Sequence, residues 1–202
     1  MKGLIFIPDI SGFTDFVKKT DLDLGATVMH ELLSAIIDSN PLELEISEIE
    51  GDAILFYKIG QPIALNNVFI AFNNMYEAFN KKYSELCFKY KIKLELSLKF
   101  ILHYGEMSVY YIKGFKKLYG QMIIESHRLL KNGAGNSNYI LITEDYMQAV
   151  RSSSENFHIV QVNYTNYSSQ LFTDLREISY YFFHYRGDEP NSFNRPMQNI
   201  LA

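Results

Sequence analysis

Residues 92–103 constrain the fold more than any other segment, because apolar and polar side chains alternate along almost its whole length. A strand repeats its side-chain direction every two residues, so this pattern predicts a strand in a sheet with one buried face. Residues 24–37 instead carry apolar side chains three and four positions apart, which is the spacing of an amphipathic helix. The chain therefore needs a fold in which helices cover a sheet.

The other periodic segments extend this prediction to the order β-α-α-β-β-α-β-β-α-β-α-β-β. Expected strands are 2–7, 42–49, 53–59, 92–103, 107–112, 139–142, 157–164 and 175–185, and expected helices are 10–19, 24–37, 62–90, 122–130 and 143–150. Ser11 is the expected N-cap of the first helix, and Gly105 offers a turn from which residues 107–112 pair back on the preceding strand. Hairpins mixed with helical crossovers predict an α+β fold with a ferredoxin-like core and helices packed on one face of the sheet.

The length and composition indicate one soluble domain. The chain has 202 residues, which suits a single domain over residues 1–186 followed by an arm or disordered tail over 187–202. Its one cysteine, Cys87, favours a reducing compartment, so we expect a cytoplasmic protein. No apolar run reaches the ~18 residues that a membrane helix needs. The net charge of −4 argues against a broad nucleic-acid surface, so we expect neither a membrane nor a nucleic-acid partner.

The first candidate for chemistry is the junction after the first predicted strand, where Asp9 is followed by Gly12 and a helix. Helix N-terminal amide groups attract phosphate oxygens, and a carboxylate attracts a hard cation. The junction therefore suits a ligand made of a metal ion and a phosphate. Taken alone, Asp9 is better explained as a helix cap.

The second candidate is the predicted hairpin turn, in which Asp52 follows Gly51. Taken alone, this is an acidic turn exposed to solvent. If the hairpin lies beside the first strand, however, Asp9 and Asp52 can chelate divalent cations together, as in two-metal phosphoryl chemistry. The pair is therefore more informative than either residue.

These motifs resemble those of the class III adenylyl and guanylyl cyclases, in which a strand is followed by Asp-Ile-x-Gly-Phe-Thr and a later hairpin turns at Gly-Asp. Residues 9–14 read Asp-Ile-Ser-Gly-Phe-Thr, and residues 51–52 read Gly-Asp. Residues 103–105 look like the family's Ile-His-x-Gly turn, and residues 120–128 look like its Gly-x-x-Val-Asn-x-Ala-x-Arg helix. The resemblance covers roughly residues 3–150 and implies a nucleotidyl cyclase-like sheet.

A closer resemblance is to an uncharacterised group of bacterial proteins related to the cyclases. Its strings Pro-Asp-Ile-Ser-Gly-Phe-Thr, Glu-Ile-Glu-Gly-Asp-Ala and His-Arg-Leu-Leu-Lys-Asn all occur in this chain, starting at Pro8, Glu48 and His127. This second resemblance implies the same fold and adds no activity.

The cyclase resemblance implies roles for particular residues. Asp9, Asp52 and the main-chain carbonyl of Ile10 would hold two Mg²⁺ or Mn²⁺ ions on a nucleoside triphosphate. Arg128 would be catalytic, stabilising charge in the transition state across the cleft of a homodimer. The positions implied to contact the nucleotide are Gly12, Phe13, Thr14, Glu48, Lys117 and Ile124.

The ribose and base positions depart from the family pattern. The family's ribose-orienting Asn, four residues before Arg128, is replaced by Ile124, which cannot hydrogen-bond a sugar. Glu48 resembles the guanylyl cyclases, whereas Lys117 stands where the family usually has Asp, Thr or Cys. An ion pair between Lys117 and Glu48 would compete with base recognition.

Three functions stay open on these residues. The first is a nucleotidyl cyclase-like protein that binds a nucleoside triphosphate with divalent metal and, if active, forms a cyclic nucleotide at a degenerate site as a phosphorus–oxygen lyase. The second is a non-catalytic dimeric module that binds a nucleotide or another phosphorylated small molecule and regulates a partner. The third, a purely structural dimer, would follow if Asp9 and Asp52 pointed away from each other. The sequence leaves turnover undecided.

Overall fold

The computed structural model describes residues 1–93, 95–132, 138–153, 167–172 and 174–184. The strands are β1 (Lys2–Ser11), β2 (Glu45–Glu50), β3 (Ala53–Ile59), β4 (Ser97–Glu106), β5 (Ser108–Ile112), β6 (Phe115–Tyr119), β7 (Tyr139–Thr143), β8 (Tyr167–Leu171) and β9 (Glu177–His184). The helices are α1 (Phe13–Lys19), α2 (Leu22–Asp38), α3 (Leu65–Tyr90), α4 (Gln121–Leu129) and α5 (Glu144–Ser153). No helix within these ranges is both long and apolar enough to cross a membrane.

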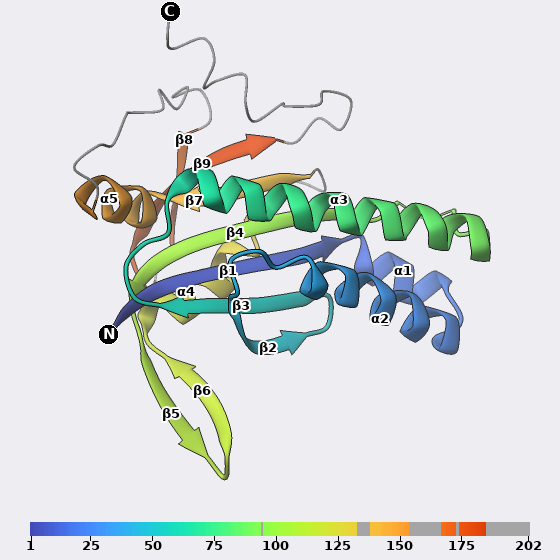
Figure 1. Ribbon diagram of the computed structural model, residues 1–202, viewed down its shortest axis with the longest axis horizontal. Helices are drawn as coiled ribbons and strands as arrows, with labels where there is room; N and C mark the ends of the chain where they lie inside the picture. Colours follow the sequence, from blue (N-terminus) through green and yellow to red (C-terminus); the bar gives the residue numbers. More distant parts are fainter. Residues whose placement is uncertain (94, 133–137, 154–166, 173, 185–202) are drawn as a thin grey trace, which may run out of the picture.

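Seven strands form one sheet in the order β2-β3-β1-β4-β7-β9-β8. All neighbours in this sheet are antiparallel except β4 and β7, which are parallel. β1 runs between β3 and β4 (Figure 1), and every residue of β1 after Lys2 is buried. The last residues of β1, including Asp9, therefore lie at the end of a strand inside the sheet.

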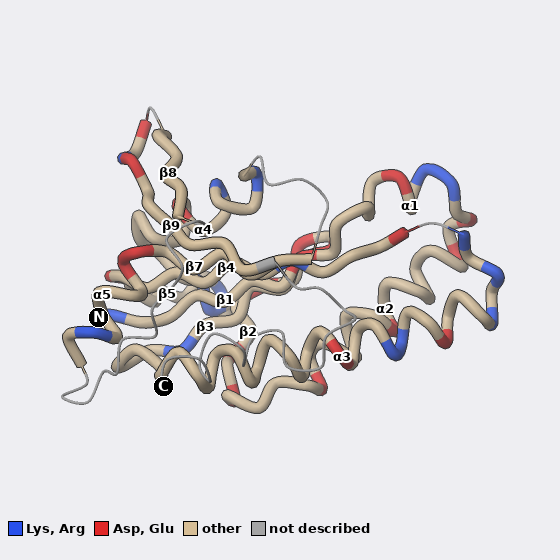
Figure 2. The backbone as a smooth tube through the Cα atoms, turned by 90° about the horizontal axis from the view of Figure 1, so that it is seen from above, with Lys and Arg blue, Asp and Glu red and all other residues tan. Residues whose placement is uncertain are grey.

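Apolar cores lie on both faces of the sheet. The helices α2, α3 and α5 cover one face, where Leu4 of β1 and Phe72 of α3 belong to the same buried cluster. The shorter helix α4 lies over part of the other face, where Met122 and Leu129 belong to a cluster with Ile7 of β1. Figure 2 shows α2 and α3 on one side of the sheet and α4 on the other. The expected α+β class, with the long helices on one face of the sheet, is confirmed.

The junction between β1 and α1 differs from the sequence prediction. β1 continues to Ser11, which pairs with Ser97 of β4, so Ser11 is not the N-cap of the first helix. Gly12 takes that position with a φ of 91°, and no side chain caps the helix. A Cβ atom at Gly12 would lie 2.7 Å from the carbonyl oxygen of Glu95. The close approach of these two backbones therefore requires glycine at this position. The helix begins after it, at Phe13.

The segment after β4 also differs. β4 continues through Gly105 to Glu106, and the expected pairing of residues 107–112 with it is wrong, because β5 pairs with β6. These two strands form a separate ribbon that projects from the body (Figure 1). Lys113 and Gly114 have φ values of 47° and 87° in its two-residue turn. Two positive φ values in succession are typical of the turn that matches the twist of a hairpin.

The other elements of the structure agree with the prediction to different degrees. The hairpin of β2 and β3, with its turn at Gly51, is confirmed, as are the amphipathic helices α2 and α3. The strands β6 and β8 were not predicted. The predicted strand at 157–164, the domain end at 186 and the tail at 187–202 lie outside the described residues.

Candidate functional site

Asp9 and Asp52 lie together at the end of β1. Asp9 lies on the face of β1 that carries Ile7, beneath α4. Asp52 follows Gly51, whose φ of 61° closes the β2–β3 turn. The backbone N–H of Ile10 donates a hydrogen bond of 3.1 Å to the carbonyl oxygen of Asp52, which fixes the turn against β1. The two carboxylates therefore share one side of the sheet.

The two carboxylates affect each other electrostatically. Burial and the nearby charge of Asp9 raise the pKa of Asp52 to about 6. Asp9 itself is buried, with only 8% of its surface exposed. Two acids held this close in a partly dehydrated place need a counter-ion or a shared proton.

Lys99 supplies that counter-ion. It is the cross-strand neighbour of Asp9 on β4, and its Nζ lies 2.7 Å from Oδ2 of Asp9. The same Nζ donates a hydrogen bond of 3.2 Å to the carbonyl oxygen of Leu130, which caps the C-terminal end of α4. The alternation of residues 92–103 puts Lys99 on the polar side of its strand, but it does not say which residue lies opposite.

A pocket of about 710 Å³ opens beside the carboxylates, between the sheet and α4. Its lining residues are Ile7, Asp9, Glu48, Glu50, Gly51, Asp52, Ala53, Leu55, Ile124, His127, Arg128, Leu130 and Lys131. The fold thus brings together five residues that the sequence analysis singled out, namely Asp9, Glu48, Asp52, Ile124 and Arg128. Of these, Ile124 presents an apolar side chain that is 51% exposed.

Three other predicted nucleotide contacts, Gly12, Phe13 and Thr14, line a smaller adjacent pocket of about 370 Å³. This pocket is formed by Asp9, Ile10, Ser11, Gly12, Phe13, Thr14, Asp15, Asp52 and Lys99. It shares Asp9 and Asp52 with the larger pocket, so the two carboxylates stand between a sheet–helix cleft and the β1–α1 turn.

The residues present fit a hard cation bound with an oxygen-rich ligand. In the described part of the chain, no set of three or more His, Cys, Asp or Glu side chains is placed to hold a metal ion. Asp9, Asp52 and the Ile10 carbonyl form a smaller oxygen set, which the oxygens of a bound phosphate would complete. The hydroxyl of Ser11 is buried and has no hydrogen-bond partner among the described residues. A polar ligand at this position would satisfy it.

The two predicted base-reading residues contact each other. Nζ of Lys117, on β6, donates a hydrogen bond of 2.8 Å to Oε2 of Glu48, on β2, and this bond raises the pKa of Lys117. The ion pair anticipated from the sequence is therefore present. Nε2 of His127 lies 3.4 Å from the other oxygen of Glu48. Lys117 does not line the pocket itself, and His127 joins it from α4.

Arg128 lines the pocket of its own chain. Its Nη2 donates a hydrogen bond of 2.8 Å to Oδ2 of Asp174, in the turn between β8 and β9. Both side chains are about half exposed, so this ion pair contributes little to stability and can exchange for a phosphate. Asp174 lies 46 residues from Arg128, and the sequence carried no signal for the contact.

A buried polar network fastens α4 to the sheet. Nε2 of His103 on β4 and Oε2 of Glu125 on α4 are 2.9 Å apart, and Nδ1 of His103 is 2.9 Å from Oγ1 of Thr143. Arg176 donates two hydrogen bonds, of 2.7 and 3.0 Å, to the carboxylate of Glu125. Burial opposes ionisation of Glu125, but the hydrogen bonds of His103 and Arg176 hold its pKa well below the usual range. The sequence suggested that His103 shapes a turn, whereas it anchors a helix.

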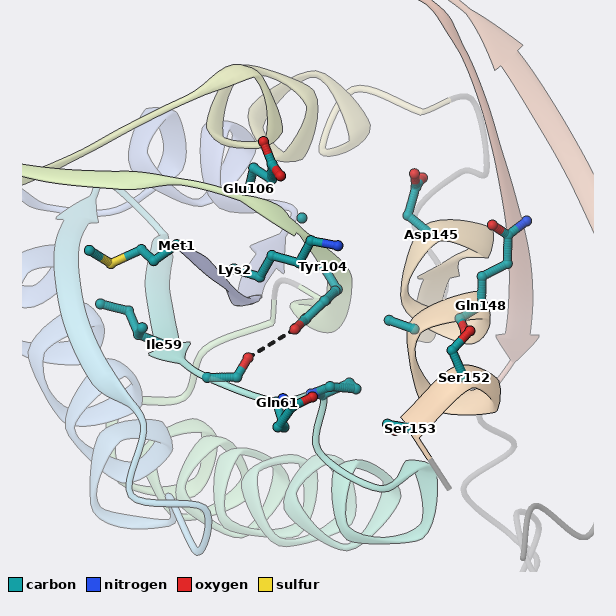
Figure 3. Close-up of a pocket in the computed structure, with 14 residues that line it drawn as sticks. Met1, Lys2, Ile59, Gln61, Tyr104, Glu106, Asp145, Gln148, Ser152 and Ser153 are labelled. Carbon is teal, nitrogen blue, oxygen red and sulfur yellow. Dashed lines mark hydrogen bonds between the residues drawn. The ribbon is translucent and has the colours of Figure 1, made fainter. Parts of the chain in front are cut away.

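A second pocket, of about 760 Å³, lies at the opposite end of β1 (Figure 3). It is lined by Lys2 of β1, Tyr104 and Glu106 of β4 and residues of α5 such as Asp145. The hydroxyl of Tyr104 donates a hydrogen bond of 2.9 Å to the Gly60 carbonyl. This pocket is slightly larger, but it contains none of the predicted site residues. We therefore regard the carboxylate pocket as the candidate site.

Comparisons with known proteins identify a sequence family and one curated relative. A family model with the description "Protein of unknown function (DUF2652)" matches residues 29–139. The uncharacterized protein Rv2561/Rv2562 of Mycobacterium tuberculosis is 28% identical over 134 residues, which are 62% of this chain and 61% of the relative. The match thus spans about three-fifths of the length of that curated relative.

Solved structures with a similar fold include nucleotidyl cyclase domains. The guanylyl cyclase Cya2 has a TM-score of 0.66 at 15% identity and covers 95% of both chains. The adenylyl cyclase CyaB from Pseudomonas aeruginosa has a TM-score of 0.61 at 15% identity, over 93% of this chain and 96% of its own. A class III adenylyl cyclase-like ATP-binding protein from the same organism has a TM-score of 0.58 at 16% identity, over 74% of this chain and 34% of its own. At these identities the likeness shows the cyclase fold.

Proposed function

The chain belongs to the family described as a protein of unknown function (DUF2652), and from its site we propose that it is a nucleotidyl cyclase-like protein that binds a nucleoside triphosphate with divalent metal. The observation that carries the proposal is the pairing of Asp9 with Asp52 at the wall of a pocket of about 710 Å³. Related folds are described as binding such ligands: one neighbour is an ATP-binding protein and another is a guanylate cyclase domain in complex with GTP.

The proposed roles follow from where each group lies. Asp9, Asp52 and the Ile10 carbonyl would hold Mg²⁺ or Mn²⁺, which would neutralise the triphosphate and polarise its α-phosphate. The turn at Gly12, Phe13 and Thr14 would contact phosphate oxygens from the adjacent pocket. Arg128, already at the pocket wall, would exchange Asp174 for the departing pyrophosphate.

Turnover would be cyclisation of the bound nucleotide. The ribose 3′-oxygen would form a bond to the α-phosphorus while the bond between that phosphorus and the pyrophosphate breaks, and the hydroxyl proton would pass to solvent. Ile124 lies one turn before Arg128 on α4 and offers no hydrogen bond to orient the ribose. We therefore expect turnover to be slow, since misorientation of the attacking group raises the barrier.

Specific contacts favour a second candidate, a non-catalytic module that binds a nucleotide or another phosphorylated small molecule and regulates a partner. Glu48 is already paired with Lys117 and lies close to His127, so the carboxylate that would select a base is occupied within the chain. A ligand recognised mainly through its phosphates would not need that carboxylate. The two candidates share the Asp9–Asp52 site, and they differ in turnover and in whether the base of the ligand is recognised.

We further propose that the protein works as a cytoplasmic homodimer. The ribbon of β5 and β6 exposes large apolar side chains, with Tyr111 67%, Phe115 73% and Tyr119 70% exposed. A two-stranded ribbon is marginally stable in water unless another surface covers it. A second copy of the chain would supply that surface. The single cysteine agrees with the cytoplasm.

Isothermal titration with non-hydrolysable nucleoside triphosphates, with and without Mn²⁺, tests the proposal. We expect metal-dependent binding that the Asp9→Ala/Asp52→Ala variant loses. The matched control is Asp38→Ala/Glu77→Ala, which removes two carboxylates from a different pocket and should bind like the wild type. If the wild type binds none of these nucleotides, the proposal fails. If it binds, an assay for cyclic product separates the enzyme from the binding module.

A further inference from the structure

Lys99 lines the candidate site but belongs to none of the sequence motifs that predicted it. Its side chain is only 16% exposed, and that of its partner Asp9 is 12% exposed. The ammonium group is held from two directions, by Asp9 at 2.7 Å and by the Leu130 carbonyl at 3.2 Å. A lysine placed this way is not a solvated surface charge.

The position of the ammonium group has an electrostatic consequence. Asp9 and Asp52 together would carry two negative charges, and Lys99 offsets one of them. Lys99 acts on both partners, because its charge also lowers the pKa of Asp52 against the larger effects of burial and of Asp9. A cation that approaches Asp9 therefore meets an oxygen that is already paired and a positive charge a few ångströms away.

We propose that Lys99 is the resident counter-ion of this carboxylate pair and sets its affinity for divalent metal, because a metal ion must displace the ammonium group from Asp9. The inference rests on the proposed metal–nucleotide function. Bare metal binds weakly in this arrangement, whereas a metal ion that arrives with a triphosphate brings phosphate oxygens that can receive the displaced ammonium. Lys99 thereby makes the site selective for the metal–nucleotide complex over free metal.

Displacement of the Lys99 ammonium group would also affect the C-terminal end of α4. Leu130, whose carbonyl accepts the hydrogen bond of Lys99, is the C-cap residue of the helix that carries Ile124, His127 and Arg128. When Lys99 leaves Asp9 for a ligand phosphate, the geometry of its bond to Leu130 changes as well. Occupancy of the carboxylate pair is thus linked through one side chain to the end of the helix that lines the opposite wall.

A purely structural role for Lys99 is the competing explanation. In that case the ion pair only joins β1 to β4, and its removal destabilises the protein without strengthening metal binding. Lys99→Met and Lys99→Gln both remove the charge, and the glutamine keeps a hydrogen-bond donor near Asp9, so at least one folded neutral variant is expected. Lys99→Arg keeps the charge.

The experiment titrates the protein with Mn²⁺ alone. Electron paramagnetic resonance of the free ion and calorimetry each measure the binding. We expect Lys99→Met and Lys99→Gln to bind Mn²⁺ at least about tenfold more tightly than the wild type, and Lys99→Arg to bind like the wild type. Lys58→Met is the matched control, because Lys58 is also a strand lysine that donates to a main-chain carbonyl, that of Leu42. It removes the same charge elsewhere and should leave Mn²⁺ affinity unchanged.

Several results would overturn the inference. Neutral variants that bind Mn²⁺ no more tightly than the wild type, or not at all, show that Lys99 does not control metal access. An equal gain in Lys58→Met shows a general effect of charge. The gain must also disappear when Asp9→Ala is added to Lys99→Gln. Failure of the proposed function would look different, since the wild type would then bind no nucleotide with or without Mn²⁺.

Discussion

Two effects raise the pKa of the Asp52 carboxyl group. Burial, followed by the charge of Asp9, raises its pKa to about 6 from an ordinary value of 3.8. Between these two values the folded protein binds more protons than the unfolded chain. The free energy of unfolding should therefore fall as the pH rises from about 4 to about 6 and stay reduced above that range.

Asp52→Asn should remove this pH dependence. Above pH 6, in metal-free buffer, we expect the variant to be more stable than the wild type by about 1–2 kcal/mol, after allowing for solvent screening of a half-buried group. Below pH 4 the two proteins should be similar. Urea denaturation at a series of pH values measures the difference. Asp38→Asn is the control, and an unchanged slope in Asp52→Asn would contradict the prediction.

Ile124→Asn tests whether the ribose position can be restored. The new amide would stand one helical turn before Arg128 at the pocket, where it could hydrogen-bond a sugar. One such bond contributes about 1 kcal/mol, so we expect roughly fivefold tighter binding of a nucleoside triphosphate in calorimetry. Ile49→Asn is the control, because Ile49 is 49% exposed, much like Ile124, and does not line the pocket. An equal effect in both variants would refute a specific contact.

The sequence identifies some site residues and misses others for a physical reason. Asp9 is recognisable because it follows a predicted strand in a short motif. Asp52 is recognisable because it follows Gly51 in a predicted turn. Lys99 is not, because its place opposite Asp9 depends on the register between β1 and β4. Arg176 contacts Glu125 across 51 residues, and no local pattern encodes such a distance. Local motifs predict which groups exist, and the pairing of strands decides which of them meet.

At the scale of elements, the β1–α1 junction depends on Gly12. Gly12→Ala would place a Cβ 2.7 Å from a main-chain oxygen at a φ of 91°. We expect a loss of roughly 1–3 kcal/mol in the free energy of unfolding, measured in urea. Gly25→Ala is the matched control, since Gly25 lies within α2 and its Cβ would have only ordinary contacts at 3.9 Å, with Phe16 and Thr20. It should stabilise the helix by about 0.5–1 kcal/mol. Equal effects of the two substitutions would contradict the prediction.

Most elements with a strong period were predicted correctly, although the alternating segment predicted as a strand over 92–103 is a strand only from Ser97. The apolar positions of α2 and α3 repeat with the helical spacing, and the β2–β3 hairpin has turn residues at its tip. The period cannot say with which strand a segment pairs, so β5 was assigned to β4 although the turn at Lys113 and Gly114 joins it to β6. β8 was missed because its side chains are almost all exposed and no apolar stripe marks it.

At the scale of the whole molecule, the candidate site depends on how α4 is held over the sheet. The wall of the pocket consists of the sheet on one side and α4 on the other. Arg176 and Asp174, both in the turn between β8 and β9, contact Glu125 and Arg128 of α4. The last strands of the sheet thus position the helix that faces Asp9, although they lie far from Asp9 in the strand order.

The projecting ribbon of β5 and β6 gives the prediction for assembly. Its tip carries the cross-strand pair Ile112 and Phe115, which are 54% and 73% exposed. An apolar pair this exposed raises the free energy of the protein in water, and packing by a second copy would lower it. Ile112→Thr/Phe115→Thr removes this apolar surface and keeps residues that favour strands.

We expect the wild type to elute with about twice the 23.5 kDa mass of one chain in size-exclusion chromatography with light scattering. The Ile112→Thr/Phe115→Thr variant should shift to the mass of one chain at the same concentration. Phe88→Gln is the control, because Phe88 is 90% exposed but lies on α3, away from the ribbon. A monomeric wild type, or a variant that stays dimeric, would contradict a dimer through this surface. If the monomeric variant also loses nucleotide binding, residues of both copies complete the site.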